Sequence, residues 1–395
     1  MENRRIRIGI IGGGLAGASI ANSLSRIPSV AIDVFEAAPE FSERGAAVGL
    51  ALPSQRALQE LLEDAKETLR KAQSVPIASS RLMVGSGPHA GTVLVDFGDA
   101  EKGGPPNSSS TEPHSCESSL HLYFEDGTDY EFDAVIGADG VFSTVRDHVL
   151  SDESKQYSAS PAGFWDCRVL VPFEKAKMVL GEELFKLDRQ YGWAGDGAFI
   201  LHDVLENGTL VQCVISAVEN ESPRDRKHLL TREFLNKTLA SWLDGPIASG
   251  IIDLVMEQDD PRGYSEREHK ATPTYARGRV CIMGDAAHAS TPFQGAGAGQ
   301  AFEDGMILSA LLGHISSPDD IEVAFKVYDE IQRPRGQRVI DSSRGTGQIM
   351  CGRSEAGLDP GKIVQTVAPR WDFLNLDFKS YVQEAVQKLD ERLRA

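Results

Sequence analysis

Short apolar runs bounded by glycine recur along the chain and predict buried strands. The runs at residues 5–11 and 30–36 flank a segment, 15–27, whose apolar positions recur at helical spacing. Strand, helix and strand in this order form a β-α-β unit and therefore a parallel sheet. Two further apolar runs, at 130–140 and 278–285, also lead into glycine. We therefore predict one α/β domain whose sheet is assembled from segments far apart in the sequence.

The pattern between the last two of these runs is different. Longer apolar runs at 198–206 and 209–219 are joined through Asn207-Gly208, a dipeptide that accepts the positive φ angles of a tight hairpin turn. They predict an antiparallel sheet in a second domain, covered by a helix around 226–242. Near the C-terminus, apolar residues at helical spacing predict a helix that packs on the body of the protein. These residues are Phe378, Val382, Ala385, Leu389 and Leu393.

The composition is that of an ordinary globular protein. Hydrophobic residues make up 41% of the 395 residues and charged residues 25%. The formal net charge of -18 argues against nucleic acid and anionic membranes as partners, because both attract clustered lysine and arginine. We find no signal-peptide pattern and no apolar run as long as a membrane span, so we expect a cytoplasmic protein. Five widely spaced cysteines without a C-x-x-C pair suit reduced thiols and predict no metal site.

A first glycine motif lies between the first strand and the following helix. Gly12, Gly14 and Gly17 form G-x-G-x-x-G, which lets backbone N–H groups approach a pyrophosphate whose charge the helix N-terminus favours. Glu36 ends the next strand, where its carboxylate can accept hydrogen bonds from an adenosine ribose. The sequence thus predicts a dinucleotide site. A similar stretch at 85–91 precedes a strand instead of a helix, so we expect no second site of this kind.

A second small-residue segment, "CIMGDAAHASTPFQGAGAGQAFEDG", covers residues 281–305. Its small residues leave room for a flat ring close to the backbone. Asp285 can accept hydrogen bonds from a ribityl chain, and the helix that begins after the glycines can direct its N-terminus at a flavin ring, which is anionic when reduced. A cofactor that spans both glycine segments explains their separation, so we expect FAD. A nicotinamide dehydrogenase without flavin is the alternative, but it has no use for the second segment.

Three motifs of the chain resemble those of single-component FAD-dependent aromatic monooxygenases of the para-hydroxybenzoate and salicylate hydroxylase type. They are the first glycine motif with Glu36, "DAVIGADGVFSTVR" at 133–146 and "GDAAHASTPFQGAGAGQAFEDG" at 284–305. "YDEIQRPRGQRV" at 328–339 also resembles the segment that follows in salicylate hydroxylase-like members. The resemblance implies NADH or NADPH as co-substrate, molecular oxygen, and hydroxylation of a phenolic or aromatic acid such as salicylate through a flavin C4a-hydroperoxide. A secondary-metabolite monooxygenase acting on a larger phenol or polyketide is the alternative within this fold.

The resemblance also implies the fold class. We expect an α/β (α+β) protein with a Rossmann-like FAD-binding domain of the para-hydroxybenzoate hydroxylase type, assembled discontinuously, an antiparallel-sheet substrate domain and a C-terminal helix. The FAD-binding domain would consist of residues 1–80, 120–155 and 271–350. The remaining segments would be a truncated substrate-domain hairpin with a flexible join at 81–119, the substrate-binding domain at 156–270 and a C-terminal helical segment at 351–395.

The resemblance further implies roles for individual residues. Asp139 would lie on the pyrophosphate or nicotinamide path, and His288 fits either a catalytic base or a structural hydrogen bond. Arg168 would favour a substrate phenolate or carboxylate, while Pro292 and Phe293 would line the substrate pocket. Phe293 replaces the histidine of many relatives, which points to a different or less polar substrate. The residues expected to bind the cofactor are Gly12, Gly14, Leu15, Ala16, Gly17, Glu36, Arg44, Ala47, Asp139, Asp285, Gly295, Gly297 and Ala298.

One part of the family pattern is absent. Relatives carry an R-x-x-L helix and further strands between the "VLVDF" strand and the motif at 133–146. Here the join contains the stretch 101–119, which is rich in glycine, proline and serine and cannot bury a core. The missing arginine would contact FAD, so we expect weaker retention of the cofactor. A truncated flavoprotein fold with impaired FAD binding and no turnover is therefore a third alternative.

Overall fold

The computed structural model describes the chain except for short stretches. Several residues discussed above lie outside the described part: Arg44 and Ala47, the turn residue Asn207 and the stretch 101–119. The described residues are 4–38, 49–62, 64–72, 74, 79–97, 120–124, 126–187, 189–205 and 208–394.

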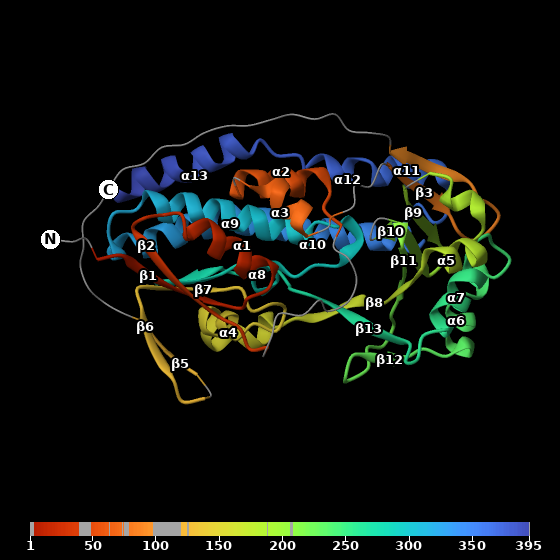
Figure 1. Ribbon diagram of the computed structural model, residues 1–395, viewed down its shortest axis with the longest axis horizontal. Helices are drawn as coiled ribbons and strands as arrows, with labels where there is room; N and C mark the ends of the chain where they lie inside the picture. Colours follow the sequence, from red (N-terminus) through yellow and green to blue (C-terminus); the bar gives the residue numbers. More distant parts are fainter. Residues whose placement is uncertain are drawn as a thin grey trace.

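A five-stranded sheet gathers strands from three distant parts of the chain (Figure 1), in the order β14-β15-β7-β1-β2. The pairs β15–β7, β7–β1 and β1–β2 are parallel, and only the β14–β15 pair is antiparallel. The predicted parallel sheet of separated segments is therefore confirmed. Its strands are β1 (Ile6–Ile11), β2 (Val30–Phe35), β7 (Ala134–Gly137), β14 (Ala276–Arg277) and β15 (Val280–Ile282).

Helices on both sides of this sheet build the first core. The apolar faces of α1, α9, α10 and α13 pack with β1, β7 and β15 in one cluster of buried residues. Phe378, Ala385 and Leu389 of the predicted C-terminal stripe are buried in it, whereas Leu393 is exposed. The helices are α1 (Leu15–Leu24), α2 (Leu52–Leu61), α3 (Ala65–Lys71), α4 (Thr144–Leu150), α9 (Gly297–His314), α10 (Ile321–Met350) and α13 (Phe378–Leu393).

An eight-stranded sheet forms the second part, in the order β12-β13-β8-β11-β10-β9-β3-β4. All its pairs are antiparallel except β3–β9, so the predicted antiparallel sheet is confirmed. Its strands are β3 (Ser79–Val84), β4 (Val93–Phe97), β8 (Ser160–Pro172), β9 (Arg189–Gly195), β10 (Ala198–Leu205), β11 (Leu210–Val218), β12 (Lys227–Leu229) and β13 (Arg262–Glu268).

One face of the large sheet packs on three helices. Trp165, Trp193 and His202 belong to this second core. Burial lowers the pKa of His202 to about 3, so its imidazole is neutral. These residues belong to the core and lie on the opposite face of the sheet from Phe164 and Phe199. The covering helices are α5 (Phe173–Leu180), α6 (Arg232–Thr238) and α7 (Ala248–Met256).

Two predicted elements differ from the structure. The helix expected around 226–242 begins only at Arg232, because Thr231 caps it by accepting a hydrogen bond from Phe234 N at 3.1 Å, while β12 pairs with β13. The run at 130–140 is divided into β6 and β7. Strand β6 pairs with β5 in a separate hairpin, whereas β7 enters the parallel sheet. The hairpin strands are β5 (Leu120–Tyr123) and β6 (Asp129–Phe132).

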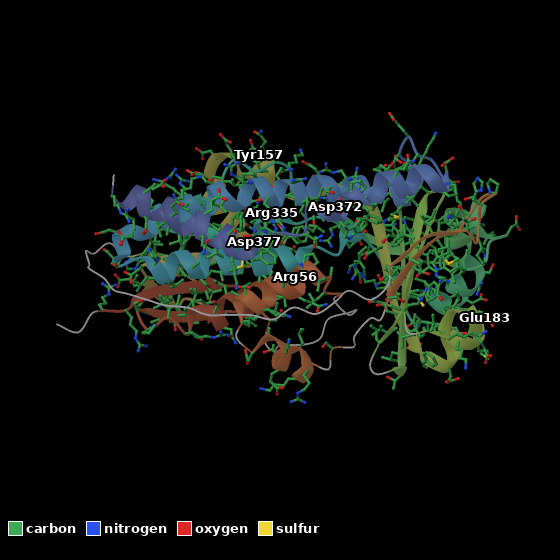
Figure 2. All side chains as sticks on the ribbon, turned by 90° about the horizontal axis from the view of Figure 1, so that it is seen from above. Arg56, Tyr157, Glu183, Arg335, Asp372 and Asp377 are labelled. Atoms are coloured by element: carbon green, nitrogen blue, oxygen red, sulfur yellow. The ribbon has the colours of Figure 1, made fainter. Side chains whose placement is uncertain are left out.

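Helix α10 connects the two parts. Its 30 residues span about 45 Å, from the parallel sheet to β9 and β10 of the large sheet. Figure 2 shows Glu183 at the outer end of the sheet domain and Arg335 among the long helices. The remaining elements are α8 (Asp285–His288), α11 (Pro360–Val367), α12 (Pro369–Asp372), and the short 3-10 helices η1 (Ser151–Tyr157), η2 (Glu182–Phe185), η4 (Ala240–Trp242), η5 (Pro292–Gln294) and η6 (Pro318–Asp320).

Two further findings concern the described residues as a whole. Among them, no helix is both long enough and apolar enough to cross a membrane. The four cysteines that the structure describes are all buried and free; they are Cys167, Cys213, Cys281 and Cys351.

Candidate functional site

The predicted site residues follow the carboxyl ends of four parallel strands. Gly12 follows β1, Glu36 follows β2, Asp139 lies two residues beyond β7, and Gly284 lies two residues beyond β15. Parallel strands end at the same edge of a sheet, which is where open α/β sheets bind ligands. The tertiary structure therefore brings together motifs that are separated by more than 100 residues in the sequence.

The three glycines of the first motif have different roles in the structure. Gly12 has a φ of +105°, and a Cβ there would lie 2.3 Å from the carbonyl oxygen of Ala138. A Cβ on Gly17 would lie 1.9 Å from the carbonyl oxygen of Gly12, so this glycine allows α1 to pack against the turn. Gly14 precedes α1 and has no atom within 4 Å of its Cβ position. The open space beside Gly14 suits a pyrophosphate approaching the helix N-terminus.

Glu36 turns back towards the glycine motif. Its carboxylate accepts hydrogen bonds from the backbone N–H of Gly13 and of Ala38, each at 2.8 Å. These two hydrogen bonds from backbone N–H groups hold the carboxylate of Glu36 beside the glycine turn. Its predicted bond to a ribose stays a prediction.

Ala16 joins the two glycine-rich segments. Gly284 has a φ of +59°, and a Cβ there would lie 2.8 Å from the Cβ of Ala16. The start of α1 and the turn before Asp285 therefore touch, as a cofactor spanning both segments requires. Leu15, on the outer side of the same turn, is half exposed.

The Asp139 carboxylate caps helix α4. It accepts hydrogen bonds from the hydroxyl of Ser143 at 2.5 Å, the backbone N–H and hydroxyl of Thr144 at 2.8 and 3.1 Å, and the N–H of Val145 at 3.2 Å. These bonds use the carboxylate for local structure. A cofactor contact by this residue therefore falls to its backbone.

Arg146 is a buried clamp between two motifs. Its Nη1 donates to the carbonyl oxygens of Ala286 and Ala287 at 3.0 and 3.1 Å, and its Nη2 donates to Tyr157 O at 3.1 Å and to the Thr272 hydroxyl at 2.7 Å. Burial lowers the pKa of Arg146 to about 10, so it remains charged at neutral pH. The local sequence pattern does not predict the contacts with Ala286, Ala287 and Thr272, because these partners lie more than 100 residues away.

Asp285 has the properties expected of a ligand-binding carboxylate. It is exposed, and no hydrogen bond to it is found within the described part of the chain. Protein atoms nevertheless surround it closely, and this desolvation raises its pKa, opposed by the charge of His288. The carboxylate of Asp285 is therefore accessible to a ligand.

His288 makes a structural bond. It is buried, and its Nε2 lies 2.7 Å from Oδ2 of Asp304, which also accepts the N–H of Gly284 at 2.7 Å. Burial alone would lower the pKa of His288, but the Asp304 carboxylate outweighs it and raises this pKa. Of the two roles considered for His288, the geometry supports the structural one.

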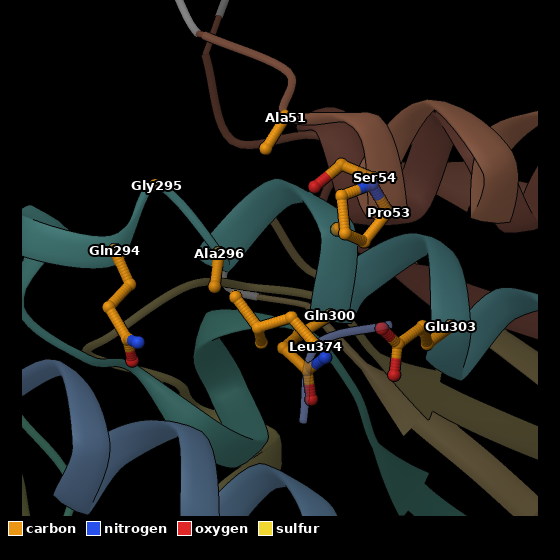
Figure 3. A pocket seen from close by; sticks show the side chains of 10 residues that line it. Ala51, Pro53, Ser54, Gln294, Gly295, Ala296, Gln300, Glu303 and Leu374 are labelled. Carbon is orange, nitrogen blue, oxygen red and sulfur yellow. The ribbon is translucent and has the colours of Figure 1, made fainter. Parts of the chain in front are cut away.

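The turn after His288 borders a hollow of about 240 Å³, including its opening to solvent (Figure 3). Gly295 has a φ of +59°, and neither Gly295 nor Gly297 has an atom within 4 Å of its Cβ position. Helix α9 begins at Gly297 with no side chain capping its N–H groups. Ala298 is half-buried in this first turn. The hollow is lined by Ala51, Pro53, Ser54, Gln294, Gly295, Ala296, Gly299, Gln300, Glu303 and Leu374.

Pro292 and Phe293 lie where the two parts of the molecule meet. Pro292 is exposed, whereas the ring of Phe293 packs on Phe164 of β8 at 4.8 Å and on Phe199 of β10 at 6.1 Å. Phe164 and Phe199 belong to the face of the large sheet that α5, α6 and α7 leave uncovered. This face of the large sheet therefore adjoins the turn after His288, residues 289–296, which we call the flavin turn.

Arg168 lies two residues along β8 from Asp166, on the same face as Phe164. Its Nε donates to Asp166 Oδ2 at 2.8 Å, and its side chain is 39% exposed. The arginine is thus placed on the expected side of the sheet, but a carboxylate of the protein already pairs with it. A role in substrate binding remains a prediction.

These residues fit FAD. Open space over Gly14, Gly295 and Gly297, an unpartnered Asp285 and two uncapped helix N-termini are arranged along one edge of the sheet. The first motif suits the pyrophosphate, and the second suits a ribityl chain and a flat ring. The fold and the site together define a flavoprotein with a separate substrate sheet.

Comparisons with known proteins agree with this class. Residues 110–343 match the FAD binding domain family. The chain is 30% identical over 393 residues to 6-methylsalicylate 1-monooxygenase of Aspergillus terreus, a match that covers 88% of this chain and 84% of the relative. It is 28% identical over 431 residues to a salicylate hydroxylase of Pseudomonas putida, covering 98% and 97% of the two chains. The chain therefore belongs to the family of FAD-dependent aromatic monooxygenases.

A solved structure shows the same fold. The substrate complex of a salicylate hydroxylase superposes with a TM-score of 0.78 at 22% identity, covering 96% of this chain and 98% of that one. The match to the FAD binding domain family makes FAD the cofactor of this protein, and NADH or NADPH is the co-substrate typical of the family.

Proposed function

We propose that this protein hydroxylates a small phenolic ring held between the flavin turn and the face of the large sheet that bears Phe164 and Phe199. The packing of Phe293 against Phe164 carries this proposal, because it joins the flavin turn to that sheet. The relatives named above act on salicylates, which makes salicylate-like compounds the first class to test. The less polar residue at position 293 favours a neutral or larger phenol as the second class.

Each part of the site has its own task in this proposal. Gly14 and the N-terminus of α1 hold the pyrophosphate, and Asp285 holds the ribityl chain. Gly295, Gly297 and the N-terminus of α9 lie against the ring. When bound, FAD supplies the redox chemistry, accepting a hydride from NADH or NADPH and activating molecular oxygen.

The protein contributes positioning and exclusion of water instead of a nucleophile. Phe293 and Phe164 would form an apolar wall beside the reacting ring, with Pro292 at the turn. Arg168 would stabilise a phenolate that forms as the ring is activated, because it is the cation on this part of β8. Its pairing with Asp166 reduces its attraction for a second carboxylate.

The absent R-x-x-L segment bears on cofactor retention. The match to the salicylate hydroxylase of Pseudomonas putida extends over 431 aligned positions, so at least 36 of them (431 − 395) have no residue in this chain. We propose that FAD is held more weakly as a result. Purified protein that stays yellow through exhaustive dialysis, with full flavin occupancy, would contradict this.

One aerobic experiment tests the function. The protein is loaded with FAD, and oxidation of NADH and NADPH is measured against a panel of phenols. Stimulation by a phenol together with a hydroxylated product is the expected result. If no phenol stimulates oxidation although the flavin spectrum shows full occupancy, the proposed hydroxylation is wrong.

We also propose a cytoplasmic location. The buried free thiols of Cys167, Cys213, Cys281 and Cys351 support it, because such thiols suit a reducing compartment.

A further inference from the structure

Glu266 lies at an irregularity between the two strands that lead from the substrate sheet towards the parallel sheet. Strands β13 and β8 pair up to Ser265, shift their register, and pair again from Arg267. Gly163, in the stretch of β8 opposite this shift, has a φ of +83°. Bulges of this kind redirect a side chain and are frequent beside active sites.

The carboxyl group of Glu266 is buried without a partner. Both of its oxygens are shielded from solvent, and neither has a hydrogen-bond partner in the part of the chain that the structure describes. Burial raises the pKa of Glu266 well above its ordinary value, and the nearby Asp166 raises it further, against an opposing effect of Arg168. Glu266 is therefore a neutral carboxylic acid, which can both donate and accept a hydrogen bond.

This acid lies on the flavin side of the sheet. Its charge, when present, would act on Asp166 and on the thiol of Cys351. Cys351 packs with Phe164, whose ring contacts Phe293 of the flavin turn at 4.8 Å. Glu266 is thus linked to the flavin turn through Cys351 and Phe164.

Two arginines near this end of β8 and β13 are already paired. Arg168 donates to Asp166 at 2.8 Å, and Arg344 of α10 donates to Glu268 at 2.6 Å. A substrate carboxylate would find both of these arginines occupied. Bringing an unpaired charge into such a site is unfavourable, whereas an uncharged oxygen can pair with a neutral acid.

We propose that Glu266 determines specificity by hydrogen-bonding an uncharged carbonyl or hydroxyl oxygen of the substrate, so that the site prefers neutral phenols to phenolic acids. Hydroxyaryl ketones, aldehydes and amides are the class that fits. Because the acid makes no hydrogen bond in the free protein, turning it towards a ligand breaks none. This inference rests on the proposed hydroxylation of phenols and narrows its substrate class.

The test compares compounds that share the phenol and differ in charge: salicylate, salicylamide and 2-hydroxyacetophenone. Substrate-stimulated NAD(P)H oxidation and the ligand-induced change in the flavin spectrum are both measured. We expect kcat/KM and affinity to favour the neutral compounds by roughly tenfold or more. Equal values, or a preference for salicylate, overturn the inference while leaving hydroxylation intact. If none of the compounds is turned over, the proposed function fails, and the ratio of the dissociation constants still decides the inference.

Variants of Glu266 show whether this residue causes the preference. Glu266→Leu should lower kcat/KM for the neutral compounds about 10- to 100-fold and remove the preference. Glu257→Gln is the matched control, because this exposed carboxylate pairs with Lys175 on the far side of the sheet. An unchanged ratio in a folded, FAD-loaded Glu266→Leu protein would mean that Glu266 is structural only, and would overturn the inference.

Glu266→Gln provides a second test if the leucine variant does not fold. The amide replaces a neutral acid without a change of charge, so the preference for neutral compounds should persist. If salicylate affinity instead rises until the ratio disappears, Glu266 repelled it as an anion, and the neutral acid we infer is wrong.

Discussion

Replacing Arg146 by alanine should both destabilise the protein and weaken FAD binding. Its guanidinium is 2% exposed and donates to four acceptors, the carbonyl oxygens of Ala286, Ala287 and Tyr157 and the hydroxyl of Thr272. A buried acceptor left without a partner costs about 1–3 kcal/mol. Water entering the space of the side chain restores part of this. We therefore expect a net loss of about 3–5 kcal/mol, which is below the sum for four acceptors left without a partner.

The effect on the cofactor follows from the position of the acceptors. Ala286 and Ala287 directly follow Asp285, so loss of the clamp frees the backbone that places this carboxylate. Arg146→Lys keeps the charge. A single ammonium nitrogen, however, cannot replace the several N–H donors of the planar guanidinium, which point at acceptors in different directions. We expect the lysine variant to lie between wild type and Arg146→Ala in stability and in FAD affinity.

Unfolding in urea, followed by tryptophan fluorescence, measures the loss in stability, and flavin fluorescence quenching measures the FAD dissociation constant. Arg232→Ala serves as the control, because its pair with Asp253 is exposed and should change stability by less than about 1 kcal/mol. The reasoning is refuted if Arg146→Ala unfolds at the same urea concentration as wild type and this control.

Three further predictions follow from single positions. Gly14→Ala should weaken FAD binding about tenfold and leave the apoprotein stable. Gly17→Ala should instead lower the stability of the apoprotein by about 1–3 kcal/mol, because its Cβ meets the Gly12 carbonyl oxygen. Equal effects of the two variants on the FAD dissociation constant and on unfolding would contradict this. Asp285→Ala should weaken FAD about 10- to 100-fold without loss of apoprotein stability, and an unchanged dissociation constant would count against its role. Burial raises the pKa of Asp203 to about 6, against a hydrogen bond from Gln212, so stability should fall by about 2 kcal/mol as the pH rises from 4 to 6. Asp203→Asn should remove this fall, and parallel pH profiles of the two proteins would refute the prediction.

Much of the fold could be predicted from local pattern because each element depends on its own residues. Strand β1, the turn at Gly12 and helix α1 follow one another as expected, and the small residues at 281–305 indicated a flat ring. The helix around 226–242 was wrong over its first turns, since pairing with β13 outweighed helical spacing there. Arg44 and Ala47 lie outside the described residues, and their contacts stay predictions.

The site was predictable only in part. The sequence indicated which segments carry Gly14 and Asp285, but it left His288 open between a base and a structural residue. Its bond to Asp304 supports the structural role, and a pairing 16 residues apart leaves no periodic signal. Arg168 was expected to meet the substrate, and only the structure shows that Asp166 already pairs with it.

By itself, the sequence determined the parallel sheet, the glycine turns at its edge and the choice of flavin, because backbone geometry and local spacing encode these features. Only the tertiary structure decided which side chains lie in the same space. It placed Arg146 against Ala286 across 140 residues, Phe293 against Phe164, and the carboxyl of Glu266 in a buried place without a partner. Burial and charge pairing depend on neighbours from every element packed around a residue, and no stretch of sequence contains them all.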